Sequence, residues 1–213
     1  MELILAGVPL ILRGLMVTAT VSIAVLLLGT LLGVGGGLAL SYGAKPLRWF
    51  VRVYVDLCRG IPQLVLIFAI FYGFPALGLP LSAVLAGILA LSLFCGAHVA
   101  EVVRGGVDSI PRGQADAAKA IGLTFTQRLR NVILPQALRR ILPAWVNTAV
   151  EIVKSSSLVS LVSVVDLTMA IQQIVGRTRE ALLFYAVAAA LYFAINSTLS
   201  LAGRRLERRF AHG

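Results

Sequence analysis

Five apolar stretches divide the chain, and the segments between them carry most of its charge. The stretches cover roughly residues 15–40, 61–77, 81–103, 141–165 and 181–203. Each is close to the ~20 residues that a helix needs to cross the hydrocarbon core of a bilayer. The pattern therefore predicts an all-α integral membrane protein with five transmembrane helices, forming a single transmembrane domain over residues 1–213.

Composition supports this prediction and excludes a large water-soluble domain. Hydrophobic residues make up 59% of the chain and charged residues 13%, with a mean hydropathy of +0.93. A typical soluble domain is about a quarter charged. The net charge of +10 does not indicate nucleic-acid binding, because the basic residues follow the ends of the apolar stretches. Met1 and Glu2 do not form a basic leader, so we expect the first span to be retained.

The distribution of Lys and Arg predicts how the chain is oriented in the membrane. The segments after spans one and three and the C-terminal tail carry four, seven and four of the nineteen cations. With five spans, all three segments lie on one side, which is the cytoplasmic side by the positive-inside rule. The N-terminus is then outside and the C-terminus inside. The long cytoplasmic loop covers about 104–140, and the outer loops cover about 75–80 and 166–180.

The long loop contains a hydrophilic, alanine-rich stretch that predicts two short helices. Residues 114–121 favour a helix that Gly122 can end, and Thr124 with Gln127 forms a capping-box pattern for the next helix. Pro135 marks where the chain turns back toward the bilayer. Two interpretations remain open: a helix pair resting on anionic lipid, or a small-residue helix lying in a groove of a partner with an acidic surface.

A family resemblance favours the second interpretation. The stretch from Asp116 to Pro135 closely resembles the E-A-A-x3-G-x9-I-x-L-P coupling loop of permease subunits of bacterial ATP-driven importers, with Asp116 in place of Glu and Val132 in place of Ile. Residues 59–64, 101–107, 109–114, 133–137 and 154–160 resemble segments of the histidine/glutamine/arginine/opine-type polar amino acid permeases. The residues that this resemblance assigns to ATPase coupling are Gly113, Gln114, Asp116, Ala117, Ala118, Gly122, Leu134 and Pro135.

The resemblance implies a type I importer permease fold in the bacterial inner membrane. It implies these partners: an ATP-binding subunit dimer, a second permease subunit that is identical or related, a periplasmic or surface solute-binding protein, an amino acid substrate and membrane lipid. We expect no cofactor on this chain. The G-x-x-x-x-G-K-[ST] phosphate loop is missing from the sequence, so ATP and Mg²⁺ are expected on a separate ATPase.

Polar residues within the spans are candidates for the solute path, because ionisable groups in a membrane are costly. The candidates are His98, Asn147, Glu151, Lys154, Ser155, Ser156 and Ser157. Glu151 either faces a cavity or pairs with Lys154. The serines either bond helix carbonyls or form a broken helix beside a polar path. We expect an inter-helix hydrogen bond from His98, and a pair between Glu101 and Arg104.

Two further features of the sequence concern helix packing and the class of protein. Gly29, Gly33 and Gly37 share a helix face, for which we expect close packing within this subunit. The sequence has no nucleophile–base set and no metal-ligand spacing, so it indicates a transporter subunit and not an enzyme. An uncoupled channel or scaffold, and a permease for another small polar solute such as an opine, are the alternatives. The sequence leaves the transported amino acid open.

Overall fold

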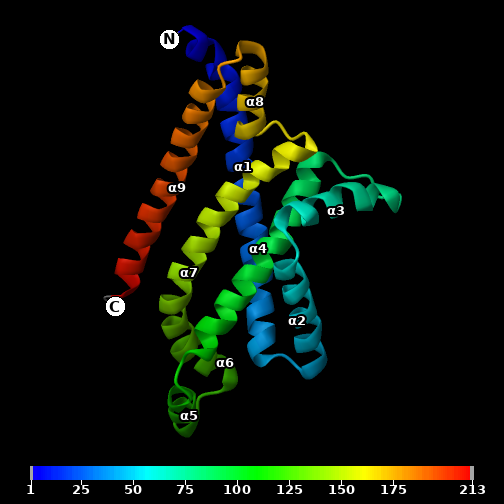
Figure 1. Ribbon diagram of the computed structural model, residues 1–213. Coiled ribbons are helices and arrows are strands. Elements are labelled where there is room, and N and C mark those ends of the chain that lie inside the picture. Colours follow the sequence, from blue (N-terminus) through cyan, green and yellow to red (C-terminus); the bar gives the residue numbers. More distant parts are fainter. Residues whose placement is uncertain (1, 212–213) are drawn as a thin grey trace.

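The computed structural model describes residues 2–211, and side chains are described for residues 7–208. All regular structure in this range is helical. The elements, shown in Figure 1, are α1 (Glu2–Tyr42), α2 (Lys45–Gly60), α3 (Gln63–Ala76), α4 (Ala83–Asp108), α5 (Arg112–Ala120), α6 (Phe125–Arg128), the π-helical turn η1 (Leu129–Ile133), α7 (Leu134–Ser155), the 3₁₀ segment η2 (Ser156–Val162), α8 (Leu167–Thr178) and α9 (Ala181–Ala211).

The spans are less uniform than the five predicted from hydropathy. Within the described residues, three helices are long and apolar enough to cross a membrane: α1, α4 and α9. The number rises to five if each of two bent pairs counts as one span: α2 with α3, bent by 108°, and the rod Phe125–Val162 with α8, bent by 52°. The predicted second span, residues 61–77, is α3 alone. Its 14 residues reach only ~21 Å, less than the ~30 Å hydrocarbon core.

Two helices lie where the sequence predicted loops. Residues 41–60 were expected to be a cytoplasmic connection, but Lys45–Gly60 forms α2, which packs against α1 and α4. Residues 166–180 were expected to be an outer loop, but most of them form α8. Asp166 caps α8 by accepting from the Met169 N–H at 2.9 Å, and Thr18 of α1 accepts from the Leu167 N–H at 3.0 Å. Hydropathy missed both helices because each is amphipathic.

Close packing between α1 and α4 forms the centre of the subunit. A Cβ added at Gly29 would lie 2.5 Å from the Cys95 Cβ, and one at Gly37 would lie 2.6 Å from the Val103 Cβ. Gly33 faces Val99 in the same way. The glycine face therefore packs within this subunit, as predicted, and it allows the two helix backbones to approach each other closely.

The second half of the loop does not form a separate surface helix. Pro135 lies in the first turn of α7, where its missing N–H costs little, and η1 joins α6 to α7 without a break in the rod. The expectation that the chain turns at Pro135 was therefore wrong. A π-turn provides the local irregularity that a proline needs without ending the helix.

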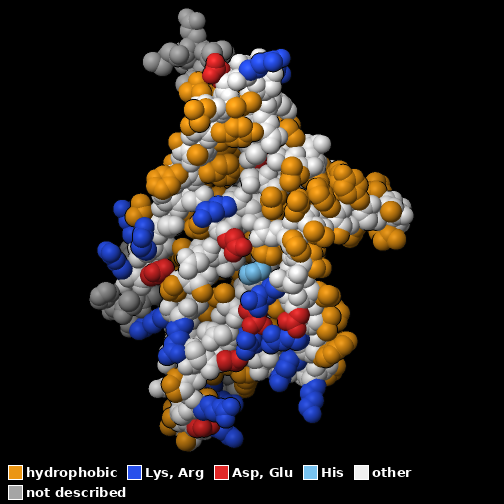
Figure 2. Space-filling view, in the orientation of Figure 1, with side chains coloured by type: hydrophobic (Ala, Val, Ile, Leu, Met, Phe, Trp, Pro, Cys, Tyr) orange, Lys and Arg blue, Asp and Glu red, His pale blue; other side chains and the backbone are white. Residues whose placement is uncertain are grey.

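Different helices form the two ends of the molecule. In Figure 1, α8 and the N-terminal part of α1 lie at one end, and α5 and α6 lie at the other, near the end of α1 and the start of α2. In Figure 2, Lys and Arg side chains gather over the half that contains α5 and α6, whereas hydrophobic side chains cover most of α3.

Replacing Gly33 tests the α1–α4 packing against a matched control on the same helix. We expect Gly33→Ala to lower the free energy of unfolding by about 1–3 kcal/mol, because the new methyl overpacks against Val99. Gly35 has no neighbour within 4 Å of an added Cβ, so Gly35→Ala should leave stability equal or slightly higher. Unfolding in a denaturing-detergent titration measures both, and equal stability of the two variants would contradict the packing.

Candidate functional site

The helix α5 presents a face of small side chains. Gly113, Asp116, Ala117 and Ala120 recur at intervals of three or four residues, so they share one side of the helix, and all four are exposed. Beside them the side chain of Ile121 is 77% exposed. The small side chains of this face allow a partner to approach the helix backbone closely, and Ile121 offers it an apolar contact.

The turn after α5 has the local chemistry that the sequence predicted. Gly122 adopts the left-handed conformation with φ of 83°, which ends the helix without strain. Thr124 then starts α6 through a reciprocal capping box: its N–H donates to Gln127 Oε1 at 2.9 Å, and its hydroxyl accepts from the Gln127 N–H at 3.4 Å. These contacts define the end of α5 and the start of α6.

The predicted coupling residues do not all lie on the exposed face. Ala118 is only 4% exposed and packs inside the loop, and Leu134 is half-buried on α7. Gln114 accepts a long 3.5 Å hydrogen bond from Gln136, which joins α5 to α7. Pro135 is exposed. Ala118, Leu134 and Gln114 therefore support the loop's shape, whereas Gly113, Asp116 and Ala117 are available to a partner.

A charge network, which we call the Glu101 network, lies at the base of the loop. Glu101 accepts from Arg104 Nη2 at 2.7 Å, which confirms the predicted pair, and also from Arg52 Nη1 at 2.5 Å. Arg104 donates in addition to Asp108 at 3.0 Å, and Asp108 accepts from the Ser41 hydroxyl at 3.3 Å. No local spacing in the sequence predicts the contact of Arg52, because Arg52 lies 49 residues from Glu101. The network joins α1, α2 and α4.

In the membrane-spanning part, Glu151 and Lys154 do not form the ion pair that was one of two open interpretations. Glu151 instead accepts a hydrogen bond from Gln63 Nε2 of α3 at 3.2 Å. Lys154 lines a cavity of about 530 Å³ with Tyr192, Asn196 and other residues of α9. The two side chains are exposed on one face of α7 but lean toward different neighbouring helices, so they do not meet.

The remaining path candidates divide between exposed and buried positions. Asn147 is exposed and lines a smaller cavity of about 310 Å³ between α7 and α9. Ser155 and Ser156 are buried, and the hydroxyls of Ser156 and Ser157 donate to the Val153 and Lys154 carbonyls at 2.8 Å. The α-helix changes to the 3₁₀ segment at Ser156, so the serines both bond carbonyls and mark a break.

His98 differs from its predicted role. Its Nδ1 lies 3.0 Å from the Phe94 carbonyl oxygen on the same helix, and the two rings pack with centroids 4.2 Å apart. The expected hydrogen bond to another helix was therefore wrong: the residue one turn earlier on α4 provides the acceptor.

Comparison with known proteins identifies the family of the chain. Residues 26–212 match the family model described as binding-protein-dependent transport system inner membrane component. The chain belongs to this family. It is an integral membrane subunit of a transport system. The match covers the loop, the Glu101 network and the polar face of α7.

Curated relatives align over nearly their whole length. A probable amino-acid ABC transporter permease protein of Bacillus subtilis, YckA, is 33% identical over 99% of this chain and 93% of its own. The L-cystine transport system permease protein TcyB of the same organism is 37% identical over 94% and 86%. The glutamine transport system permease protein GlnP of Escherichia coli K12 is 33% identical over 95% and 94%.

Solved structures share the fold. A chain of an amino acid ABC transporter crystallised with histidines superposes with a TM-score of 0.90 at 32% identity, over 97% of this chain and 96% of that one. A chain of the MetNI methionine ABC transporter, in an inward-facing conformation, gives a TM-score of 0.81 at 23% identity, over 94% and 96%. The chain therefore has the all-helical fold of type I ABC importer permeases.

The Glu101 network yields a stability prediction. Glu101→Gln should lower the free energy of unfolding by about 1–3 kcal/mol, because Arg52 and Arg104 lose their shared counter-charge. The control is Asp56→Asn on α2, an exposed acid, expected within about 0.5 kcal/mol of wild type. Both are measured by denaturing-detergent unfolding, and equal effects would mean that the network contributes no specific stability.

Proposed function

We propose that this chain is the permease subunit of an ATP-driven importer that moves a polar amino acid across the bacterial inner membrane. The observation that carries the proposal is the exposed small-residue face of α5, held by the capping box and joined through η1 to a rod that enters the membrane. The relatives named for glutamine, arginine and cystine transport support a polar amino acid as substrate.

The proposed topology has five crossings, with the N-terminus outside and the C-terminus inside. The two bent pairs each count as one crossing. The gathering of cations at the end that holds α5 and α6 supports a cytoplasmic location for that end (Figure 2). The opposite end, with α8 and the start of α1, then faces the external solute-binding protein (Figure 1).

ATP and Mg²⁺ act on the partner ATPase dimer in this proposal, and not on this chain. Closure of the ATPases pushes on α5, and the capped turn passes the movement to α6, η1 and α7. Because α7 packs against both α4 and α9, tilting of the rod changes how the spans pack against one another. This is a rigid-body switch between inward- and outward-facing states.

A second permease subunit, identical or related, completes the path. Asn147, Glu151 and Lys154 are exposed on α7 in the isolated chain. Charged groups within a membrane face protein or a water-filled cavity rather than lipid, so this face requires a partner or an aqueous path. We assign the polar face of α7 to the solute path between the two permeases.

The second candidate function is a permease for another small polar solute, such as an opine, and the third is an uncoupled channel. The exposed face of α5 favours a coupled transporter, because a channel has no use for a small-residue docking surface. Co-purification of an ATPase with the chain separates the coupled transporter from the channel.

Coupling is tested by changing the size of one side chain on the docking face. We expect Ala117→Glu to lower uptake at least tenfold and to release the ATPase during purification, because a long charged side chain blocks close approach to α5. Ala117→Ser changes the size little and should retain both. Membrane insertion is measured in parallel, and wild-type uptake by Ala117→Glu would argue against docking at this face.

The substrate is tested with a panel of labelled amino acids, taken up by cells with and without this chain while the ATPase and binding protein are present. Loss of uptake of one basic or amide amino acid is the expected result. Glu151→Gln should then weaken uptake of a cationic substrate by about tenfold, because a charged hydrogen bond is lost. Gln63→Glu provides the comparison, since it removes the amide that donates to Glu151 and leaves the Glu151 carboxylate in place. No loss across the panel would reject an amino acid as the substrate.

A further inference from the structure

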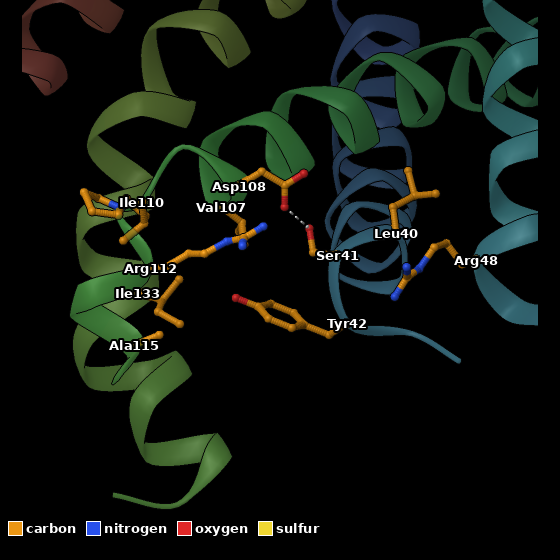
Figure 3. A pocket seen from close by; sticks show the side chains of 11 residues that line it. Leu40, Ser41, Tyr42, Arg48, Val107, Asp108, Ile110, Arg112, Ala115 and Ile133 are labelled. Carbon is orange, nitrogen blue, oxygen red and sulfur yellow. Dashed lines mark hydrogen bonds between the residues drawn. The ribbon is translucent and has the colours of Figure 1, made fainter. Parts of the chain in front are cut away.

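A cavity of about 510 Å³ lies where the ends of α1 and α4 meet the starts of α2 and α5. Its polar lining comes from Ser41, Tyr42, Arg48, Asp108 and Arg112. Figure 3 shows the Arg112 guanidinium and the Tyr42 hydroxyl directed into the same space, from opposite sides. The volume falls within the ~300–1,000 Å³ typical of small-ligand sites.

The cavity offers hydrogen-bond donors that no described side chain uses. No hydrogen bond or ion pair is formed by the side chain of Arg112 or by the Tyr42 hydroxyl within residues 7–208. Arg48 donates to the Gly43 carbonyl at 3.2 Å, which leaves the other donors of its guanidinium available. Tyr42, Arg48 and Arg112 are exposed, so these donors are open to an acceptor from outside the chain.

The charge of the cavity favours an anion. Arg48 and Arg112 each bring one positive charge to the lining. The opposing carboxylate, Asp108, is already engaged by Arg104 at 3.0 Å and by the Ser41 hydroxyl at 3.3 Å. Guanidinium groups bind phosphate oxygens through paired hydrogen bonds, and a phenol hydroxyl adds a further donor.

The surroundings favour a lipid as the source of the phosphate. Directly after Arg48, the side chains of Trp49 and Phe50 are 70% and 68% exposed. Large exposed aromatic residues are typical of the headgroup level of a bilayer, and basic pockets between helices on the cytoplasmic side bind anionic headgroups. We propose that this cavity binds the phosphate of an anionic phospholipid headgroup, beside the connection between α4 and the coupling helix α5.

The site goes beyond the proposed transport function and rests on it only for the side of the membrane. A bound headgroup would join α2, at Arg48, to α5, at Arg112, and would fix the position of the loop on the bilayer. The same phosphate chemistry could come from free phosphate, or an acidic side chain of the ATPase could occupy the cavity. The experiment separates these outcomes.

The test measures phospholipid bound to the purified full-length chain by native mass spectrometry. Phosphatidylglycerol should be retained and phosphatidylcholine should not, and excess inorganic phosphate should not displace the lipid. Arg112→Gln should reduce phosphatidylglycerol retention about tenfold, because a charged hydrogen-bond pair is lost. The matched control is Arg130→Gln, an exposed loop arginine outside the cavity, which should retain the lipid as wild type does.

Several results would overturn the proposal. They are equal retention of the two lipids, displacement by inorganic phosphate, equal losses in both arginine variants, or wild-type lipid retention in Arg112→Gln. If Arg112→Gln does not fold, Tyr42→Phe removes only a hydroxyl and should weaken retention by a smaller factor. Lipid binding needs no uptake, so failed transport with intact lipid retention would reject only the transport function. A reporter fused at the C-terminus tests the side of the membrane separately.

Discussion

The packing of α1 against α4 is the constraint on which the rest of the subunit depends. Lipid provides no hydrophobic drive for helices to associate, so close van der Waals contact between backbones has to replace it. Gly29, Gly33 and Gly37 make that contact possible. Once α1 is fixed, α4 presents its other faces to α2, α3 and α7, and these helices take their positions from it.

Ion pairs and a hydrogen bond hold α1, α2 and α4 together at the end of the subunit next to the loop. The Glu101 network ties α2 to α4, and Asp108 extends it to the last turn of α1. In the loop that follows, Gly122 and the Thr124 capping box set the turn between α5 and α6, and the π-turn η1 joins α6 to α7. In the proposed mechanism, a force applied at α5 reaches α7 through this turn and the continuous helix that follows it.

The polar face of α7 is exposed, in contrast to the packed helices described above. Asn147, Glu151 and Lys154 are exposed on this face, and within the described residues Glu151 accepts a side-chain hydrogen bond from Gln63. Such a surface is stable in a bilayer only when protein or water covers it. In the proposed assembly of two permeases, each subunit supplies half of the path through this polar face.

The sequence by itself determined the features that depend on local chemistry or on the total apolar length. These are the helical class, the family, the Gly122 turn, the Thr124 cap, the pair between Glu101 and Arg104 one turn apart, and the small-residue face of α1. Each needs only residues that are close along the chain or one helical period apart.

Only the tertiary structure decided the features that depend on what lies beside a helix. Hydropathy does not reveal α2 and α8, because an amphipathic helix is apolar only on the side that a neighbour covers. The separation of Glu151 from Lys154, the burial of Ala118 and the approach of Arg52 to Glu101 are likewise set by helix positions. Sequence spacing places two residues on a face, but the neighbouring helices decide which group each side chain meets.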